Sequence, residues 1–243
     1  MHDNRMTTEI LTIDKGQCLT DVLPAIPANT IFDKTITGCG ATHSEIVNAA
    51  RHSIIIEPNI PVILGKKAEH PFLFAVYEGI TKEDVKAYLA GEHDGYRKII
   101  TTPEGFDKKV LPAMHELEIP VYKDYFLLFD ECEKAIQDVG YRGDIYLPVE
   151  DFFKFENKAM VSATPIVPSD PRFEENGFKI LKLVPTYDSR IELTLCTTNN
   201  TVAVMRKLLK RLENETVCVF LNSTETILSL IYALRLQGRS RVF

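Results

Sequence analysis

The 243-residue sequence lacks a long apolar run and has few cysteines. No segment reaches the length of continuous apolar sequence that a membrane span requires, and no apolar core follows the polar start Met1-His2-Asp3-Asn4-Arg5. The five cysteines are widely spaced without a CxxC pair, which disfavours a zinc knuckle and a disulfide framework. These absences disfavour a membrane protein and a secreted protein, and we expect a cytoplasmic one.

The sequence also lacks an excess of positive charge, because its formal net charge is −6. An acidic total disfavours a protein that coats nucleic acid by charge alone. It remains compatible with a motor protein that binds phosphates in one groove, where the local charge matters more than the net charge of the chain. Internal repeats and low-complexity stretches are absent too, so the chain is expected to form conventional globular domains.

Short apolar runs alternate with amphipathic helical patterns along the first two thirds of the sequence. Strands are predicted at residues 30–37, 53–57, 71–77, 98–102, 125–130 and 158–162. Helices are predicted at residues 42–51, 82–89, 106–117 and 133–139. Thr81 and Asp84 form a capping-box-like start to the second helix, and Pro112 interrupts the third. This alternation predicts an α/β fold with a mainly parallel sheet flanked by helices, whose ligands bind at the carboxyl ends of the strands.

A proline-rich stretch predicts the domain organisation. Pro165, Pro168 and Pro171 fall within a charged segment, so we assign residues 1–165 to a first domain and residues 166–177 to a linker. Residues 178–243 then show strand patterns at 178–184, 190–196 and 216–221 and helical patterns at 201–212 and 226–236. This remainder is short for a domain, so we expect a partial second α/β domain.

The strongest chemical signal is an apolar strand that ends in two adjacent acids, Asp130 and Glu131. In nucleotide hydrolases, the first acid of such a pair holds Mg²⁺ and the second polarises the attacking water. The strand would present both carboxylates at its carboxyl end, where phosphates bind. The alternative is a strand that ends in a solvated acidic turn.

A second signal is the glycine-containing segment Thr37-Gly38-Cys39-Gly40-Ala41-Thr42, between a predicted strand and a predicted helix. Glycines allow backbone N–H groups to approach phosphate oxygens, and Thr42 stands where a hydroxyl would reach Mg²⁺. Ala41 occupies the place of the usual phosphate-binding lysine. Lys34 could fold over the loop instead, although the simpler expectation is that it points to solvent or pairs with an acid. The alternative for the loop is a tight turn.

Taken in order, these motifs resemble those of a superfamily-two helicase. The segment from Gly38 to Thr42 resembles the phosphate-binding loop, and Asp130-Glu131-Cys132-Glu133 resembles the DEAD/DEAH-type motif. Three further segments resemble the family's Ser-Ala-Thr motif and its two nucleic-acid contact motifs: Ser162-Ala163-Thr164, Glu57-Pro58-Asn59 and Thr101-Thr102-Pro103-Glu104-Gly105. The resemblance covers most of residues 30–165 and reaches into the tail, where Val217–Ser223 resembles the strand that opens the second motor domain. Order and spacing carry it more than any single motif.

The resemblance implies a RecA-like first motor domain that binds ATP and Mg²⁺ and, with a second such domain, moves on DNA or RNA. It implies Mg²⁺ ligation by Thr42 and Asp130, and water activation by Glu131. Its implied nucleotide-binding residues are Gly38, Cys39, Gly40, Ala41 and Thr42, with Lys34 as the candidate replacement cation. Asn59, Thr101 and Thr102 are the implied nucleic-acid contacts. Ser162, Ala163 and Thr164 are implied to couple hydrolysis to strand separation.

Two departures from the family pattern leave the function open. Ala41 removes a cation from the phosphate site, and the later motifs of the second domain, with their arginines, are not visible in the sequence. We therefore expect a helicase-like ATP-binding domain that is inactive or weak by itself, with part of a second motor domain missing. The alternative is a degenerate, non-hydrolysing scaffold that binds nucleotide or nucleic acid. An unrelated α/β protein with chance matches is the third hypothesis.

Overall fold

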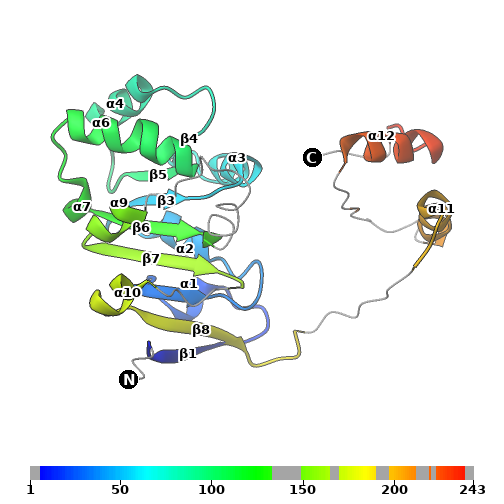
Figure 1. The fold of residues 1–243 in the computed structure, drawn as a ribbon, viewed down its shortest axis with the longest axis horizontal. Helices are drawn as coiled ribbons and strands as arrows, with labels where there is room; N and C mark the ends of the chain where they lie inside the picture. Colours follow the sequence, from blue (N-terminus) through cyan, green and yellow to red (C-terminus); the bar gives the residue numbers. More distant parts are fainter. Residues whose placement is uncertain are drawn as a thin grey trace. The chain divides into compact units, whose positions relative to one another are not determined.

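The structure is a computed structural model, and it describes residues 6–132, 149–164, 170–189, 197–211, 219 and 223–238. The chain divides into two compact units, Met1–Ser189 and Arg190–Phe243, which are described separately (Figure 1). Three predicted elements lie outside the described residues: the helix at 133–139, the strand at 190–196 and, apart from residue 219, the strand at 216–221.

The first unit is built on one eight-stranded sheet in the order β1-β8-β2-β7-β6-β3-β5-β4 (Figure 1). The strands are β1 (Thr8–Ile13), β2 (Thr30–Asp33), β3 (His52–Ile56), β4 (Phe74–Val76), β5 (Lys98–Thr101), β6 (Tyr125–Asp130), β7 (Asn157–Ser162) and β8 (Lys179–Pro185). Neighbouring strands all pair in parallel. The predicted α/β class with a parallel sheet is therefore confirmed.

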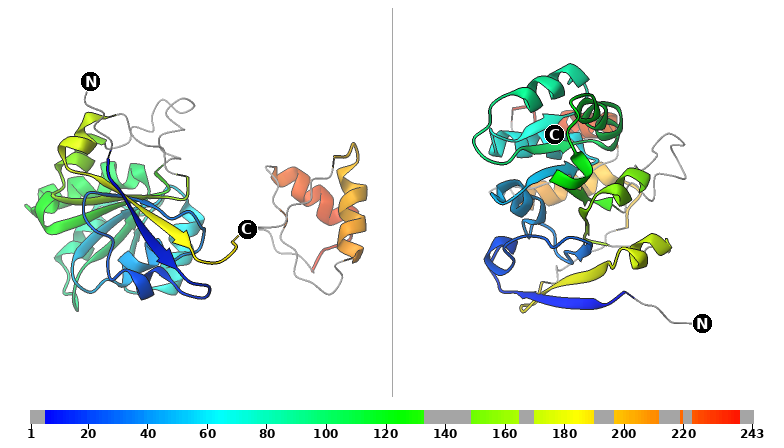
Figure 2. Two further views of the ribbon diagram at one scale, coloured as in Figure 1. Left: turned by 90° about the horizontal axis from the view of Figure 1, so that it is seen from below. Right: turned by 90° about the vertical axis from the view of Figure 1, so that its left-hand side faces the viewer.

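Helices cover both faces of this sheet (Figure 2). One face packs against α1 (Leu19–Val22), α2 (Ala41–Val47) and α3 (Ile60–Glu69). The other packs against α4 (Lys82–Ala90), the π-helix η1 (Phe106–Val110), α6 (Leu111–Glu116), α7 (Val121–Asp124), α9 (Val149–Lys154) and α10 (Pro171–Glu175). The short α5 (Pro103–Gly105) leads directly into η1.

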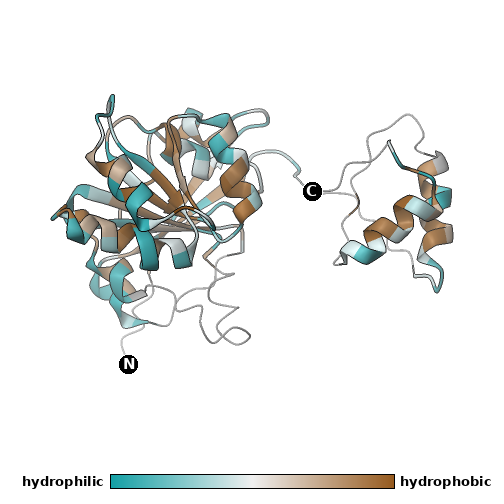
Figure 3. Ribbon diagram, turned by 90° about the horizontal axis from the view of Figure 1, so that it is seen from above, coloured by the Kyte–Doolittle hydropathy of each residue, from teal (hydrophilic) through white to brown (hydrophobic). Residues whose placement is uncertain are grey.

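The central strands are apolar on both sides because both faces are covered. Along β3, Ile54 and Ile56 belong to one core cluster and Ile55 to the other. All six residues of β6 are buried, so its sequence shows a continuous apolar run instead of an alternating one. Figure 3 shows the strands as the hydrophobic interior of the first unit. The two cores hold the carboxyl ends of the strands in fixed positions.

The first unit extends beyond the boundary predicted near residue 165. β8 pairs with both β1 and β2, so it belongs inside the first sheet and does not open the second unit. Within the segment predicted to be a linker, residues 171–175 form α10, whose Phe173 is buried. The prolines mark a connection between two elements of one domain, and the compact unit ends at Ser189.

Other elements of the first unit also differ from the predictions. β1 and α3 were not predicted at all. The predicted helix at 106–117 is divided, because η1 precedes α6 and Pro112 stands in the first turn of α6. A proline donates no backbone N–H, and the change of helix type just before it accommodates that loss.

The described part of the second unit contains α11 (Thr201–Arg211) and α12 (Thr224–Ala233). Both lie where helices were predicted, and the Ser223 hydroxyl caps α12 by accepting a hydrogen bond from Thr226 N at 3.2 Å. Over all the residues that the structure describes, no helix combines the length and apolar character needed to cross a membrane.

Candidate nucleotide site

Polar side chains gather at the carboxyl ends of five neighbouring strands, in the order β2-β7-β6-β3-β5. Lys34 follows β2, Ser162 ends β7, Asp130 ends β6, Glu57 follows β3 and Thr102 follows β5. The parallel register keeps these positions level, because Asp33 pairs with Ser162 and Val161 pairs with Asp130. The edge at which ligands were predicted to bind therefore carries a continuous row of polar groups.

The glycine-containing loop lies between β2 and α2, as predicted. Gly38 and Gly40 have φ angles of +75° and +87°, a backbone conformation that residues with a side chain adopt only with strain. Within the loop, the Cys39 side chain is buried in the hydrophobic core, and the Cys39 carbonyl oxygen accepts a hydrogen bond from Leu19 N at 2.8 Å. Burial raises the pKa of the Cys39 thiol, which therefore stays neutral. Glycine freedom and a buried anchor together fix the shape of the loop.

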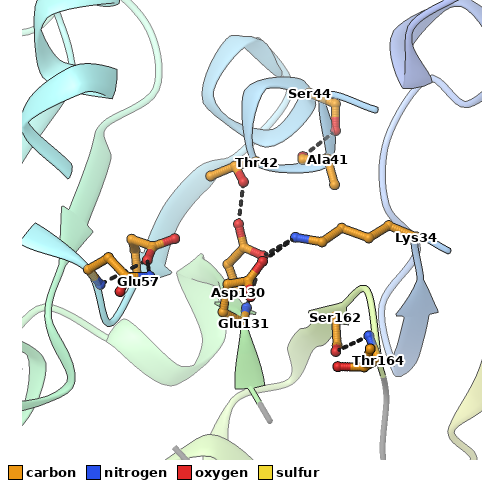
Figure 4. A network of polar contacts seen from close by, with 10 residues as sticks. Lys34, Ala41, Thr42, Ser44, Glu57, Asp130, Glu131, Ser162 and Thr164 are labelled. Atoms are coloured by element: carbon orange, nitrogen blue, oxygen red, sulfur yellow. Dashed lines mark hydrogen bonds and ion pairs between the residues drawn. The ribbon is translucent and has the colours of Figure 1, made fainter. Parts of the chain in front are cut away.

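Thr42 and Asp130 meet at the centre of the site (Figure 4). The Thr42 hydroxyl donates a hydrogen bond to Asp130 Oδ2. Asp130 is buried, and its Oδ1 accepts a hydrogen bond from Glu131 N at 2.9 Å. Glu131 has a φ of +51°, a left-handed conformation that is uncommon for a residue with a side chain and that clusters at functional sites. The loop and the acidic motif, far apart in the sequence, thus form one site.

Lys34 reaches the acidic pair from the end of β2 (Figure 4). Its Nζ lies 2.6 Å from Glu131 Oε1 and 3.3 Å from Asp130 Oδ1. Burial by itself lowers the pKa of Lys34, but the negative charges and hydrogen bonds of Asp130 and Glu131 outweigh it, so the pKa lies above its usual value. The expectation that Lys34 pairs with an acid is confirmed, and the acids are those of the candidate site.

Glu57 is a further buried carboxyl group at this edge, and the sequence analysis placed it in a contact-motif segment without assigning it a role. Its Oε1 accepts hydrogen bonds from the backbone N and the side-chain Nδ2 of Asn59, both at 2.8 Å. Burial and the charge of Asp130 raise the pKa of Glu57 to about 7. The available signal was an acid directly after a buried strand, the same pattern that identified Asp130.

The Ser-Ala-Thr segment lies beside Lys34. Ser162 is fully buried, its carbonyl oxygen accepts a hydrogen bond from Lys34 N at 2.9 Å, and its hydroxyl accepts one from Thr164 N at 2.9 Å. Ala163 is half-buried and Thr164 is exposed. The segment is therefore hydrogen-bonded to the backbone of Lys34. The role of the three residues in coupling hydrolysis to strand separation stays a prediction.

The three predicted nucleic-acid contacts lie further along the same edge. Thr101 and Thr102 are buried, and the Thr102 hydroxyl accepts a hydrogen bond from Gly105 N at 3.0 Å, so it caps α5. The Asn59 side chain donates to Glu57. The side chains of Thr102 and Asn59 thus stabilise the local backbone and the neighbouring Glu57 through hydrogen bonds. Contact between the three residues and nucleic acid stays a prediction.

The chain matches no protein-family model and no curated protein. Among solved structures, it is similar to the DUF1998 helicase MrfA, with a TM-score of 0.58 and 14% sequence identity over 89% of this chain and 38% of that one. The Hef helicase domain of Pyrococcus furiosus matches at a TM-score of 0.41 and 12% identity, over 98% of this chain and 52% of the other. The chain thus spans little more than a third of MrfA and about half of the Hef domain.

The likeness to MrfA establishes the class of fold. The first unit is a helicase-like α/β scaffold, and its parallel sheet with helices on both faces is that of a RecA-like domain. At 14% sequence identity, this similarity supports a conclusion about the fold alone.

Proposed function

We propose that the first unit is the Mg²⁺-dependent ATP-binding domain of a nucleic-acid-dependent motor related to superfamily-two helicases. The hydrogen bond between the Thr42 hydroxyl and the Asp130 carboxylate is the observation that carries the proposal. It brings together two oxygen groups from elements 88 residues apart, at the strand edge where phosphates bind in such sheets. ATP hydrolysis in this proposal also requires a second motor domain.

The residues at this point fit a nucleotide-bound Mg²⁺. Such an ion is held by one or two protein oxygens, while phosphates and water complete its coordination. Thr42 and Asp130 are the groups that would hold it here. Among the residues that the structure describes, no cluster of three His, Cys, Asp or Glu side chains could hold a metal by itself.

Calorimetric titration with ATP, in the presence and absence of Mg²⁺, tests this proposal. We expect Asp130→Ala to weaken Mg²⁺-dependent binding roughly tenfold to a hundredfold, the range for losing a charged hydrogen-bonding group, and to leave Mg²⁺-free binding nearly unchanged. Glu131→Gln should leave binding intact, because the proposed role of Glu131 is to orient water. The exposed acid Asp107 provides a matched control variant, Asp107→Ala. Equal losses with and without Mg²⁺ would contradict the assignment of Asp130.

A second candidate function is a scaffold that has lost hydrolysis. One observation favours it: Ala41, at the usual lysine position, is buried in the hydrophobic core and brings no charge to the phosphates. A wild-type chain that binds no ATP or ADP at millimolar concentration would favour this scaffold. Micromolar binding that strengthens with Mg²⁺ would favour the motor domain.

Nucleic acid is the partner that this proposal implies, since the structural neighbour MrfA is named as a helicase. We propose backbone contacts near Asn59, Thr101 and Thr102, independent of base sequence. Fluorescence anisotropy with labelled single-stranded DNA and RNA over a range of salt concentrations measures this. Contacts to phosphates predict affinity that falls steeply with salt and varies little with base sequence.

A further inference from the structure

The side chain of Lys34 crosses one strand to reach the acidic motif. It leaves the end of β2 and contacts residues at the end of β6, and β7 lies between these two strands in the sheet. Lys34 is only 8% exposed. A lysine is seldom buried unless it is paired, and here both partners belong to the candidate nucleotide site.

The backbone around Lys34 is fixed in an uncommon conformation. Thr35, the next residue, has a φ of +49°, and its hydroxyl donates a hydrogen bond to the Leu183 carbonyl oxygen. Lys34 N donates to the Ser162 carbonyl oxygen at 2.9 Å. Left-handed backbone at a residue with a side chain is strained and persists where surrounding contacts determine it. Contacts to β7 and β8 therefore hold Lys34 at the entrance to the loop.

The candidate site is rich in carboxyl groups, and a bound nucleotide would bring further negative charge. Asp130, Glu131 and Glu57 place three carboxyl groups at neighbouring strand ends, and Ala41 supplies no charge. Lys34 Nζ and the Thr42 hydroxyl contact different oxygens of the same Asp130 carboxylate, so the ammonium lies beside the proposed Mg²⁺ position. The Lys34 charge also acts on the Cys39 thiol inside the loop, where it opposes the rise in the pKa that burial causes.

We propose that Lys34 is the phosphate-binding cation of this nucleotide site, supplied from the end of β2 in place of the missing lysine at Ala41. Without nucleotide, the ammonium is held by Asp130 and Glu131. With nucleotide and Mg²⁺ bound, Asp130 would hold the metal, and the Lys34 ammonium would leave Asp130 and Glu131 to bind the β- and γ-phosphates. A lysine suits this exchange, because it is a point charge on a long, flexible stem. This inference rests on the proposed function and identifies its missing cation.

The variant Lys34→Met tests the inference in the full chain. We expect ATP and ADP affinities to fall roughly tenfold to a hundredfold, and AMP affinity to stay unchanged because AMP lacks the β- and γ-phosphates. Mn²⁺ alone, followed by electron paramagnetic resonance, should bind Lys34→Met more tightly than wild type, since the carboxylates lose their competing cation. Lys182→Met is the matched control: Lys182 lies at the same edge, half exposed, 3.6 Å from Asp33, and this variant should bind nucleotide like wild type.

Two outcomes would overturn the inference by itself. Wild-type ATP affinity in Lys34→Met would show that Lys34 does not bind phosphate and would leave the proposed function standing. Parallel losses of ATP, AMP and Mn²⁺ binding would assign Lys34 a structural role. Failure of the wild-type chain to bind any nucleotide would instead refute the proposed function, and this inference with it.

Discussion

At the scale of single residues, Glu57 makes the stability of the protein depend on pH. Its pKa of about 7 in the folded chain lies above the ordinary 4.5, so the folded state holds this proton more tightly than the unfolded state does. The resulting contribution to stability is complete below pH 4.5 and is lost as pH rises through 7. We expect Glu57→Gln, measured by urea unfolding, to raise the free energy of unfolding at pH 8 by up to about 3 kcal/mol.

This gain should shrink to nothing near pH 4.5, where the carboxyl group of wild-type Glu57 is protonated in both states. The exposed Glu78 provides the control variant Glu78→Gln, for which we expect no comparable gain. A gain of the same size at pH 4.5 and pH 8 would show that Glu57→Gln acts through packing or hydrogen bonding and not through the charge of Glu57.

The functional residues of the candidate site could be predicted from the sequence, but the contacts between their side chains could not. Thr42 and Asp130 were selected from their positions after strands, and the structure joins them by a hydrogen bond. The contact of Lys34 with Asp130 and Glu131 could not be foreseen, because it depends on β7 lying between β2 and β6. Strand order is a long-range property that no local pattern contains.

At the scale of elements, the capping box formed by Thr81 and Asp84 is a local sequence signal that correctly predicted where α4 begins. The Thr81 hydroxyl accepts a hydrogen bond from Asp84 N at 3.2 Å, and Asp84 Oδ2 accepts one from Thr81 N at 2.8 Å. We expect Thr81→Ala to lower the free energy of unfolding by about 1 kcal/mol, and Thr81→Ser to cost much less because serine keeps the hydroxyl. Thermal denaturation followed by circular dichroism measures both. Equal losses in the two variants would show that the capping hydroxyl is not the cause.

The elements that sequence reasoning missed have weak local signals. α3 contains Pro61 and Gly65 and buries only Ile63, so its sequence lacks an apolar helical face. β1 is an edge strand with one buried residue, Ile13, and pairs only with β8 in the described sheet. By contrast, the bounds of β6 were predicted without error, because burial on both faces gives a continuous apolar run. Elements in the middle of the sheet are thus the easiest to predict.

At the scale of the whole molecule, β8 changes where the first domain ends. Its residues follow a proline-rich segment, and such a segment is typical of a linker, so the sequence assigned them to the second domain. In the sheet, however, β8 separates β1 from β2 and supplies a partner to each. The local pattern correctly indicated a strand, while its domain membership depends on pairing with residues more than 140 positions earlier.

This arrangement predicts how the first unit responds to shortening. We expect residues 1–189 to unfold cooperatively and residues 1–165 not to fold, as judged by thermal melting and amide NMR dispersion. The shorter chain loses four buried apolar side chains: Phe173, Phe178, Leu181 and Leu183. At about 1.5–3 kcal/mol each, their loss removes about 6–12 kcal/mol, which is comparable with the whole stability of a typical domain. It also leaves β1 without its described partner and exposes the edge of β2. Cooperative melting of residues 1–165 at the temperature of residues 1–189 would place the domain boundary back at the prolines.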